Sequence, residues 1–206
     1  DGLQIERFCG PLSMRCAAAN VPAAIIDRAS PVPRRTREPS TWWAPSTQRA
    51  KIIASLVARI APQAAHTRRV TRVHDAAEAL GLSNLRLNAR RMQAMASATL
   101  QLAHRLERRM RSERVRAVFV VSYYDVAGYA YILAAARAGV TSVDIQHGVA
   151  GQYNMAYAQW PARQAPWRLL PRWVWTWTDA DAAVIQAWAP SGSHTALCGG
   201  NPFLDA

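Results

Sequence analysis

Two side chains that can move protons, the carboxylate of Asp125 and the imidazole of His147, each follow an apolar, β-branched segment. These segments cover 115–122 and 140–146, and an Ala-rich run over 126–138, closed by a glycine, separates them. Strand, helix and strand make a βαβ unit of about 30 residues, whose right-handed crossover brings both strand ends to one edge of a parallel sheet. Because open α/β sheets bind ligands outside that edge, the pattern predicts an acid–base site there.

His147 is the first candidate for a general base, since an imidazole accepts protons near neutral pH. Gln146 flanks it, and Gly148 leaves room for a substrate to approach the backbone. A histidine at a strand end also occurs as a hydrogen-bonded structural residue. Asp125 is the alternative base, although an aspartate before a helix is also a favoured N-cap. The sequence therefore leaves open whether His147 is a base or a structural residue, and whether Asp125 is a base or an N-cap.

A glycine-rich turn, Gly199, Gly200 and Asn201, follows a short expected strand over 195–198. Backbone N–H groups without side-chain bulk, ahead of an expected helix, suit a phosphate. A tight structural turn explains the same residues equally well. The turn is neither GxGxxG nor a P-loop, so no cofactor fingerprint is assigned.

The segment 149–172 is rich in tyrosine, tryptophan and proline, which indicates a linker or an active-site loop. Asn154 in this segment is a further candidate for substrate contact. After it, a strand over 173–178 and a helix from Asp179 or Asp181 to Trp188 begin a second strand–helix–strand module.

The first hundred residues carry weaker signals. A buried strand is expected over 22–27 and a proline-rich loop over 29–45, followed by a capped helix to about residue 61. A long helix is expected from residue 83 or 84 to 112. Its apolar stripe, which includes three methionines, is expected in the core, and its arginines on a solvated face.

The composition limits the function classes. The 206 residues are 50% hydrophobic with a net charge of +12, and Lys51 is the one lysine among 25 basic residues. The excess of arginine over lysine indicates a coding bias as much as a selected basic surface, so no nucleic-acid partner is expected. The positive net charge still implies attraction to nucleotides, phosphates or anionic membranes. Three sparse cysteines and the absence of metal-binding motifs predict neither disulfides nor a metal site. The chain begins at Asp1 and ends after the glycine turn, which suggests a fragment.

One apolar stretch, 117–136, carries a single charge and has the length of a membrane span. Its first half is β-branched and its second half Ala-rich, and four tyrosines, a glycine and Asp125 interrupt it. We therefore expect a strand and a helix there rather than a transmembrane segment.

Four short motifs, at 118–125, 144–148, 173–177 and 199–205, resemble bacterial surface-polysaccharide glycosyltransferases of the capsule and O-antigen type, which have the GT-B fold. The segment 146–148 is also similar to the aromatic-His-Gly motif of teichoic-acid glycerophosphotransferases. The resemblance covers roughly the second half of the chain.

The resemblance implies two facing Rossmann-like domains. Residues 1–148 would form the acceptor-side domain, 149–172 the linker or active-site loop, and 173–206 the start of a truncated donor-binding domain. The expected fold class is therefore α/β, a Rossmann-like parallel sheet with flanking helices plus the start of a second such domain.

The resemblance also implies an inverting, metal-independent glycosyltransferase. His147 would be the catalytic histidine and Asp125 its partner or the alternative base. Substrate or donor contacts would come from the neighbouring polar and glycine residues Gln146, Gly148, Asn154, Gly199, Gly200 and Asn201.

The expected partners are a nucleotide-sugar donor and a glycan or lipid-linked acceptor, with no resident cofactor. The expected location is the cytoplasm, with peripheral contact to the inner face of an anionic plasma membrane, and this fragment would be inactive alone. Two alternatives remain open, a glycerol-phosphate or other phospho-polyol transferase of the same fold, and a basic module that binds nucleic acid or anionic lipid.

Overall fold

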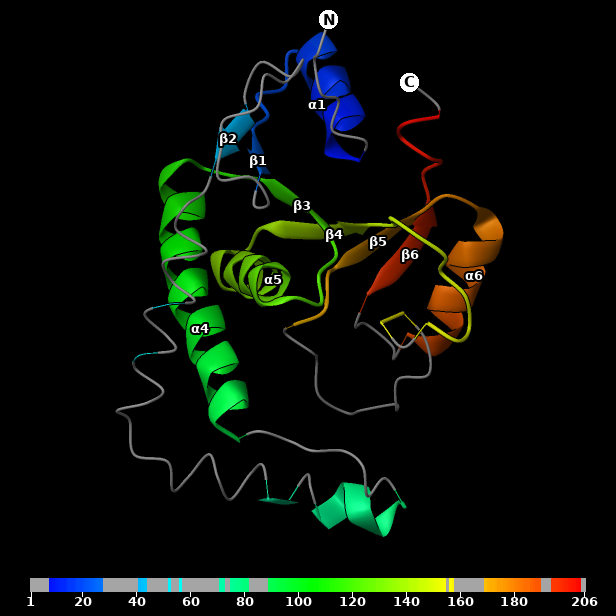
Figure 1. The fold of residues 1–206 in the computed structure, drawn as a ribbon. Coiled ribbons are helices and arrows are strands. Elements are labelled where there is room, and N and C mark those ends of the chain that lie inside the picture. The colour runs from blue at the N-terminus through cyan, green and yellow to red at the C-terminus, as the bar shows by residue number, and fades with distance from the viewer. Residues whose placement is uncertain are drawn as a thin grey trace, which may run out of the picture.

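A parallel sheet of four strands forms the centre of the described chain, in the order β3 (Ala117–Val121), β4 (Thr141–Ile145), β5 (Trp173–Thr176), β6 (Thr195–Cys198) (Figure 1). The computed structural model describes residues 8–27, 41–43, 52, 56, 71–72, 75–81, 89–154, 156–157, 169–189 and 194–204. The architecture of these residues is mixed α/β and Rossmann-like, with helices flanking the sheet, as the sequence predicts.

The unit β3–α5–β4 follows the predicted order of strand, helix, glycine and strand. Helix α5 (Val126–Ala138) ends at Gly139, whose φ of 70° is the left-handed conformation that glycine adopts most easily. Val121 on β3 pairs with Ile145 on β4 in parallel register. Both strands therefore end on the same edge of the sheet, which we call the carboxyl rim.

Strands β5 and β6 continue the same sheet. Val143, Asp144 and Ile145 of β4 pair with residues 173–175 of β5, and β5 pairs with β6, all in parallel. Helix α6 (Asp179–Trp188) connects β5 to β6 and packs against both strands. The described part of 173–204 is thus continuous with 117–145, whereas the sequence suggested that a separate domain begins at residue 173.

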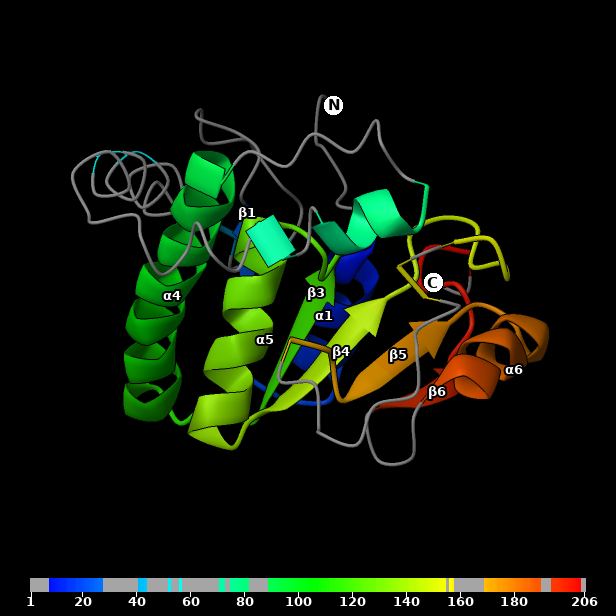
Figure 2. The same cartoon turned by 90° about the horizontal axis from the view of Figure 1, so that it is seen from below.

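Helix α5 is the central helix of the core. Eight of its residues are buried, five of them alanine or glycine, so helix α4 (Ala89–Ser112) packs closely against it. Of the expected methionine stripe on α4, Met110 is buried, whereas Met92 and Met95 are 40% and 43% exposed. Figure 2 shows α4 and α5 on the near side of the sheet and α1 (Cys9–Ala18) behind it.

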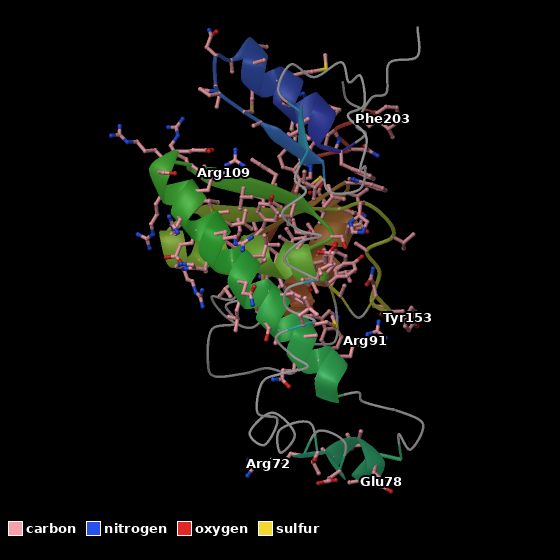
Figure 3. The ribbon with its side chains drawn as sticks, turned by 60° about the vertical axis from the view of Figure 1, so that its left-hand side comes forward. Arg72, Glu78, Arg91, Arg109, Tyr153 and Phe203 are labelled. Atoms are coloured by element: carbon pink, nitrogen blue, oxygen red, sulfur yellow. The ribbon has the colours of Figure 1, made fainter. Side chains whose placement is uncertain are left out.

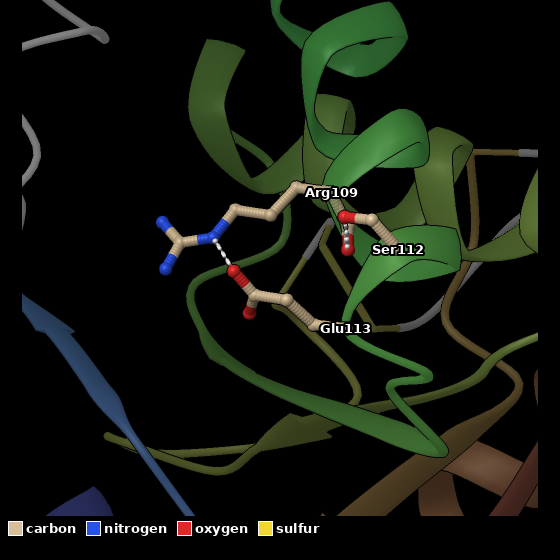
Figure 4. Close-up of polar contacts among 3 residues, drawn as sticks. All are labelled: Arg109, Ser112 and Glu113. Atoms are coloured by element: carbon tan, nitrogen blue, oxygen red, sulfur yellow. Dashed lines mark hydrogen bonds and ion pairs between the residues drawn. The ribbon is translucent and has the colours of Figure 1, made fainter.

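Arginines cover the outer surface of α4, as expected for a solvated face (Figure 3). Near its end, Arg109 Nε donates to Glu113 Oε1 at 2.7 Å, and the Ser112 hydroxyl donates to the Arg109 carbonyl (Figure 4). The side chains of this ion pair are 42% and 53% exposed, so it stabilises the helix by at most about 1 kcal/mol.

A second, smaller sheet pairs β1 (Ile25–Asp27) in parallel with β2 (Thr41–Trp43). Strand β1 lies in the predicted strand, but β2 lies in the expected loop, so that part of the prediction is wrong. A threonine and two tryptophans have high strand propensity, and the prolines of this segment flank the strand rather than interrupt it. The helix expected to reach residue 61 falls outside the described residues, apart from two isolated helical positions.

The apolar stretch 117–136 divides into β3 and α5, as predicted. Among the helices that the structure describes, none combines the length and the apolar character needed to cross a bilayer.

Candidate functional site

The carboxyl rim gathers the residues that follow β3 and β4. Asp125 comes four positions after the end of β3 and His147 two positions after the end of β4, and the two strands are paired neighbours. The structure therefore places both predicted residues on one rim, where the βαβ argument put them.

His147 is half-buried on this rim, and each of its ring nitrogens faces an oxygen atom. Nδ1 lies 3.4 Å from the carbonyl oxygen of Ile145, and Nε2 lies 3.0 Å from the hydroxyl of Tyr124. A carbonyl only accepts hydrogen bonds, so this contact favours the tautomer that carries the ring proton on Nδ1. In that tautomer Nε2 accepts from the Tyr124 hydroxyl, which is the geometry of a general base aimed at an O–H group.

Aromatic rings hold the imidazole from two sides. The ring of Phe8, at the start of α1, meets His147 edge-on with centroids 6.3 Å apart, and the Tyr124 ring lies 6.0 Å away. Tyr124 is 40% exposed, so its hydroxyl and the adjacent nitrogen lie at the surface of the rim.

Asp125 serves as the N-cap of α5. Its backbone is extended, and its side chain accepts a hydrogen bond from the Gly128 amide. The hydroxyl that lies against His147 Nε2 belongs to the neighbouring Tyr124, which sequence reasoning missed although it belongs to the same Tyr-Tyr-Asp run. The structure thus shows the capping role of Asp125, while its role as a base stays a prediction.

Beneath the rim lies a buried carboxylate that sequence reasoning also missed. Asp144, the next-to-last residue of β4, is 0% exposed. Its Oδ1 accepts from the Tyr123 amide at 3.0 Å, and its Oδ2 accepts from the Tyr157 hydroxyl at 2.7 Å. The available signal was a lone acid between valine and isoleucine, because a buried charge requires hydrogen-bond partners.

The tyrosines around this carboxylate have raised pKa values. Burial raises the pKa of the Tyr157 and Tyr123 hydroxyls far above the ordinary value, and the negative charge of Asp144 raises both further. Burial also raises the pKa of Tyr129, to which Asp125 adds. All of these hydroxyls stay protonated at neutral pH, so they act as hydrogen-bond donors.

Gln146 crosslinks the ends of two strands. Its Oε1 accepts from the Trp177 amide at 2.7 Å, and its Nε2 donates to the carbonyl of Gly148 and to Asp181 of α6. Its amide is therefore engaged within the protein. Gly148, by contrast, is exposed and would leave a Cβ in open space.

Asn154 organises the loop after β4. Its side chain donates to the carbonyl of Val149 and accepts from the amide of Ala156, so its structural place is inside this turn.

The glycine turn after β6 packs against an indole. A Cβ on Gly199 would collide with the ring of Trp175, whose Nε1 donates to the Gly200 carbonyl at 2.8 Å. Gly200 has a φ of 76°, and Asn201 accepts from the amide of Phe203. The structure shows a tight turn that requires its glycines, and a donor-binding role remains a prediction.

The electrostatics of the rim are acidic at both described helix starts. Asp125 caps α5, and Asp179 and Asp181 occupy the first turn of α6. These carboxylates occupy the helix N-termini, whose free N–H groups and positive dipole ends would otherwise favour a bound phosphate. Within the described ranges, no cluster of three or more His, Cys, Asp or Glu side chains could hold a metal ion.

A group of exposed arginines lies at the other edge of the sheet. Those at the end of α4, before β3 and at the end of α5 surround the opposite, amino edge of the sheet: Arg108, Arg109, Arg111, Arg114, Arg116, Arg137.

Comparisons with protein-family models, with curated proteins and with solved structures gave no match. The fold and the rim define the class of this protein, a parallel Rossmann-like α/β protein with an imidazole–hydroxyl pair at the carboxyl rim of its sheet. The likeness to surface-polysaccharide transferases depends on the motifs alone.

Proposed function

We propose that this protein is a glycosyltransferase that moves a sugar from a nucleotide-sugar to a hydroxyl of a surface-polysaccharide acceptor, inverting and independent of metal. The observation that carries the proposal is the 3.0 Å contact between His147 Nε2 and the Tyr124 hydroxyl on the carboxyl rim. An imidazole nitrogen that accepts from one hydroxyl can accept from another that takes its place.

In the proposed reaction an acceptor hydroxyl approaches Nε2 from the open side of the rim. His147 takes the proton as the acceptor oxygen attacks the anomeric carbon of the donor. The bond between that carbon and the phosphate oxygen breaks, and the nucleoside diphosphate leaves with the electron pair. The Nδ1 contact with the Ile145 carbonyl holds the ring in the tautomer that this step requires.

The acidic, tyrosine-rich rim supports an acceptor-side assignment. In the proposed GT-B arrangement, the described sheet belongs to the acceptor half. The enzyme would act in the cytoplasm at the inner membrane face, with the arginines of the amino edge turned towards anionic lipid.

The runner-up is a phospho-polyol transferase, in which the same activated hydroxyl attacks phosphorus instead of carbon. Its support is the likeness of the segment 146–148 to the glycerophosphotransferase motif. Because one base serves both reactions, the rim geometry alone does not separate them.

A donor panel separates the two. The full-length protein is incubated with membrane-derived acceptor and either nucleotide-sugars or nucleotide-activated glycerol phosphate, and the product mass is measured. We expect gain of a sugar residue, and gain of glycerol phosphate would establish the runner-up instead. His147→Ala, checked for native circular dichroism, should abolish either product, and transfer near the wild-type rate would overturn the assignment of the base.

A further inference from the structure

We propose that Asp144 and Tyr157 form a buried clasp that holds the loop after β4 against the sheet and thereby positions the Tyr124 hydroxyl beside His147. The clasp deepens the proposed function, because it assigns positioning residues to the same site. Neither residue touches substrate in this scheme, and both act through Tyr124.

The first arm of the clasp fixes the end of β3. Ser122 has a φ of 70°, so the chain turns away from the strand direction immediately after β3. The next amide, that of Tyr123, bonds to the Asp144 carboxylate instead of a backbone carbonyl of the neighbouring strand. Tyr124 is the following residue, so a side chain of β4 determines where the turn carrying Tyr124 lies.

The second arm of the clasp binds the loop after β4 to the Asp144 side chain. Tyr157 lies 13 residues after Asp144 and donates its hydroxyl to the other carboxylate oxygen. In the reverse direction, the Tyr123 hydroxyl donates to the carbonyl of Ala156. One hydrogen bond therefore ties the loop to β4, and the other ties the loop to the turn after β3.

Ring packing passes this constraint to the rim. The Tyr157 ring meets the rings of Tyr123 and Tyr124 edge-on, with centroids 6.0 and 6.2 Å apart. The Tyr124 ring is confined between Tyr157, Tyr123 and the imidazole of His147. Removal of the Tyr157 hydroxyl should therefore loosen the loop and change the Nε2 contact, although His147 itself is untouched.

Burial argues for a positioning role rather than a direct one. Asp144 is fully buried and Tyr157 is 3% exposed, so neither reaches a ligand at the rim. A valine or isoleucine at position 144 would fill a strand interior without the desolvation of a carboxylate. What the carboxylate adds is a pair of directed hydrogen bonds to two separate segments.

The experiment compares Tyr157→Phe with Tyr153→Phe, which makes the same chemical change in the same loop. Tyr153 is 83% exposed and points outward, so it is a matched control (Figure 3). Amide hydrogen exchange is followed for 149–157 and for the four strands, and the imidazole ¹⁵N shifts of His147 are measured by NMR. Asp144→Asn, which keeps an acceptor for the Tyr123 amide, is the second variant.

For Tyr157→Phe we expect the loop amides to exchange about tenfold faster, with shifted His147 resonances and unchanged strand amides. Tyr153→Phe should match the wild type, and Asp144→Asn should loosen the loop as Tyr157→Phe does. Unchanged loop exchange, or unshifted His147 resonances, would overturn the clasp. Uniform acceleration over the loop and all four strands would also overturn it, because that result reports general destabilisation.

Transfer kinetics distinguish the failure of the clasp from the failure of the proposed function. Amide hydrogen exchange and the imidazole ¹⁵N shifts are recorded without substrate, so they test the clasp even if the protein transfers nothing. If transfer occurs, Tyr157→Phe should lower kcat with little change in KM, since a shifted Tyr124 ring no longer holds the imidazole of His147 in place, while no substrate contact is removed.

Discussion

Gly128 in the first turn of α5 is the position where a single methyl group should do most damage near the rim. A Cβ built there lies 2.5 Å from the carbonyl oxygens of Ser122 and Tyr123, and 2.6 Å from the carbonyl carbon of Tyr123. These obstacles are backbone atoms, so no side-chain rotation relieves the overlap. Gly128→Ala must push α5 away from the turn that carries Tyr124.

The magnitude follows from two opposing effects. Inserting a methyl group into a packed interior destabilises by about 1–3 kcal/mol. Replacing glycine by alanine in a helix returns up to about 1 kcal/mol, and less in the first turn. We therefore expect a net loss of about 1–2 kcal/mol, which lowers Tm by roughly 2–8 °C for a chain of this size.

Chemical denaturation followed by circular dichroism measures this loss, and Gly148→Ala is the matched control. A Cβ on Gly148 meets nothing within 4 Å, so that variant should stay within about 0.5 kcal/mol of the wild type. Equal stability for the two variants, or a more stable Gly128→Ala, would refute the close packing inferred between α5 and the end of β3.

Three further predictions address other parts of the chain. Asp125→Ala should lose about 1 kcal/mol of unfolding free energy with the cap of α5, whereas Asp125→Asn should keep it; equal losses in urea titrations would argue against capping. Gly199→Ala should destabilise the protein because the Trp175 ring must move, and a wild-type thermal midpoint would show that the turn tolerates a side chain. Burial lowers the pKa of His194, which the Ile185 carbonyl only partly opposes. As the pH falls, His194 takes up a proton in the unfolded chain before it does so in the folded protein, so the free energy of unfolding should decrease below about pH 6.5. Denaturation of His194→Gln at pH 7.5 and 5 should lack that part of the pH dependence. An unchanged dependence in His194→Gln would contradict the assignment.

The βαβ unit was predictable because its signals are local. Asp125 marks the start of α5 and Gly139 its end, and the observed bounds, Val126–Ala138, match the predicted ones. β-Branched runs on either side fix the two strands, and the handedness of the crossover fixes their common edge. The rim position of His147 therefore followed from residues within one segment.

The sheet partner of β4 was not predictable in the same way. Strand β5 begins 28 residues after β4 ends, across a segment with no regular pattern, so the sequence offered no reason to prefer one sheet over two. Gln146 joins the two parts, because its backbone amide donates to the carbonyl of Trp175 on β5 and its side chain accepts from the amide of Trp177 just after β5. An amide side chain gives no sequence signal for such a partner.

The composition of the site was only half predictable for the same physical reason. Tyr124 reaches His147 across 23 residues, and Tyr157 reaches Asp144 through a turn of the loop. These contacts depend on tertiary packing, which periodicity and capping signals do not encode. A lone aspartate inside an apolar strand was the one available clue to the buried network.

The rate of transfer by His147→Gln relative to the wild-type full-length protein tests the central claim most directly. The variant keeps a polar side chain of similar size but cannot accept a proton at neutral pH. With native circular dichroism confirmed, removal of a general base predicts a rate lower by about 10²–10⁴-fold. A rate near that of the wild type would contradict the role assigned to His147.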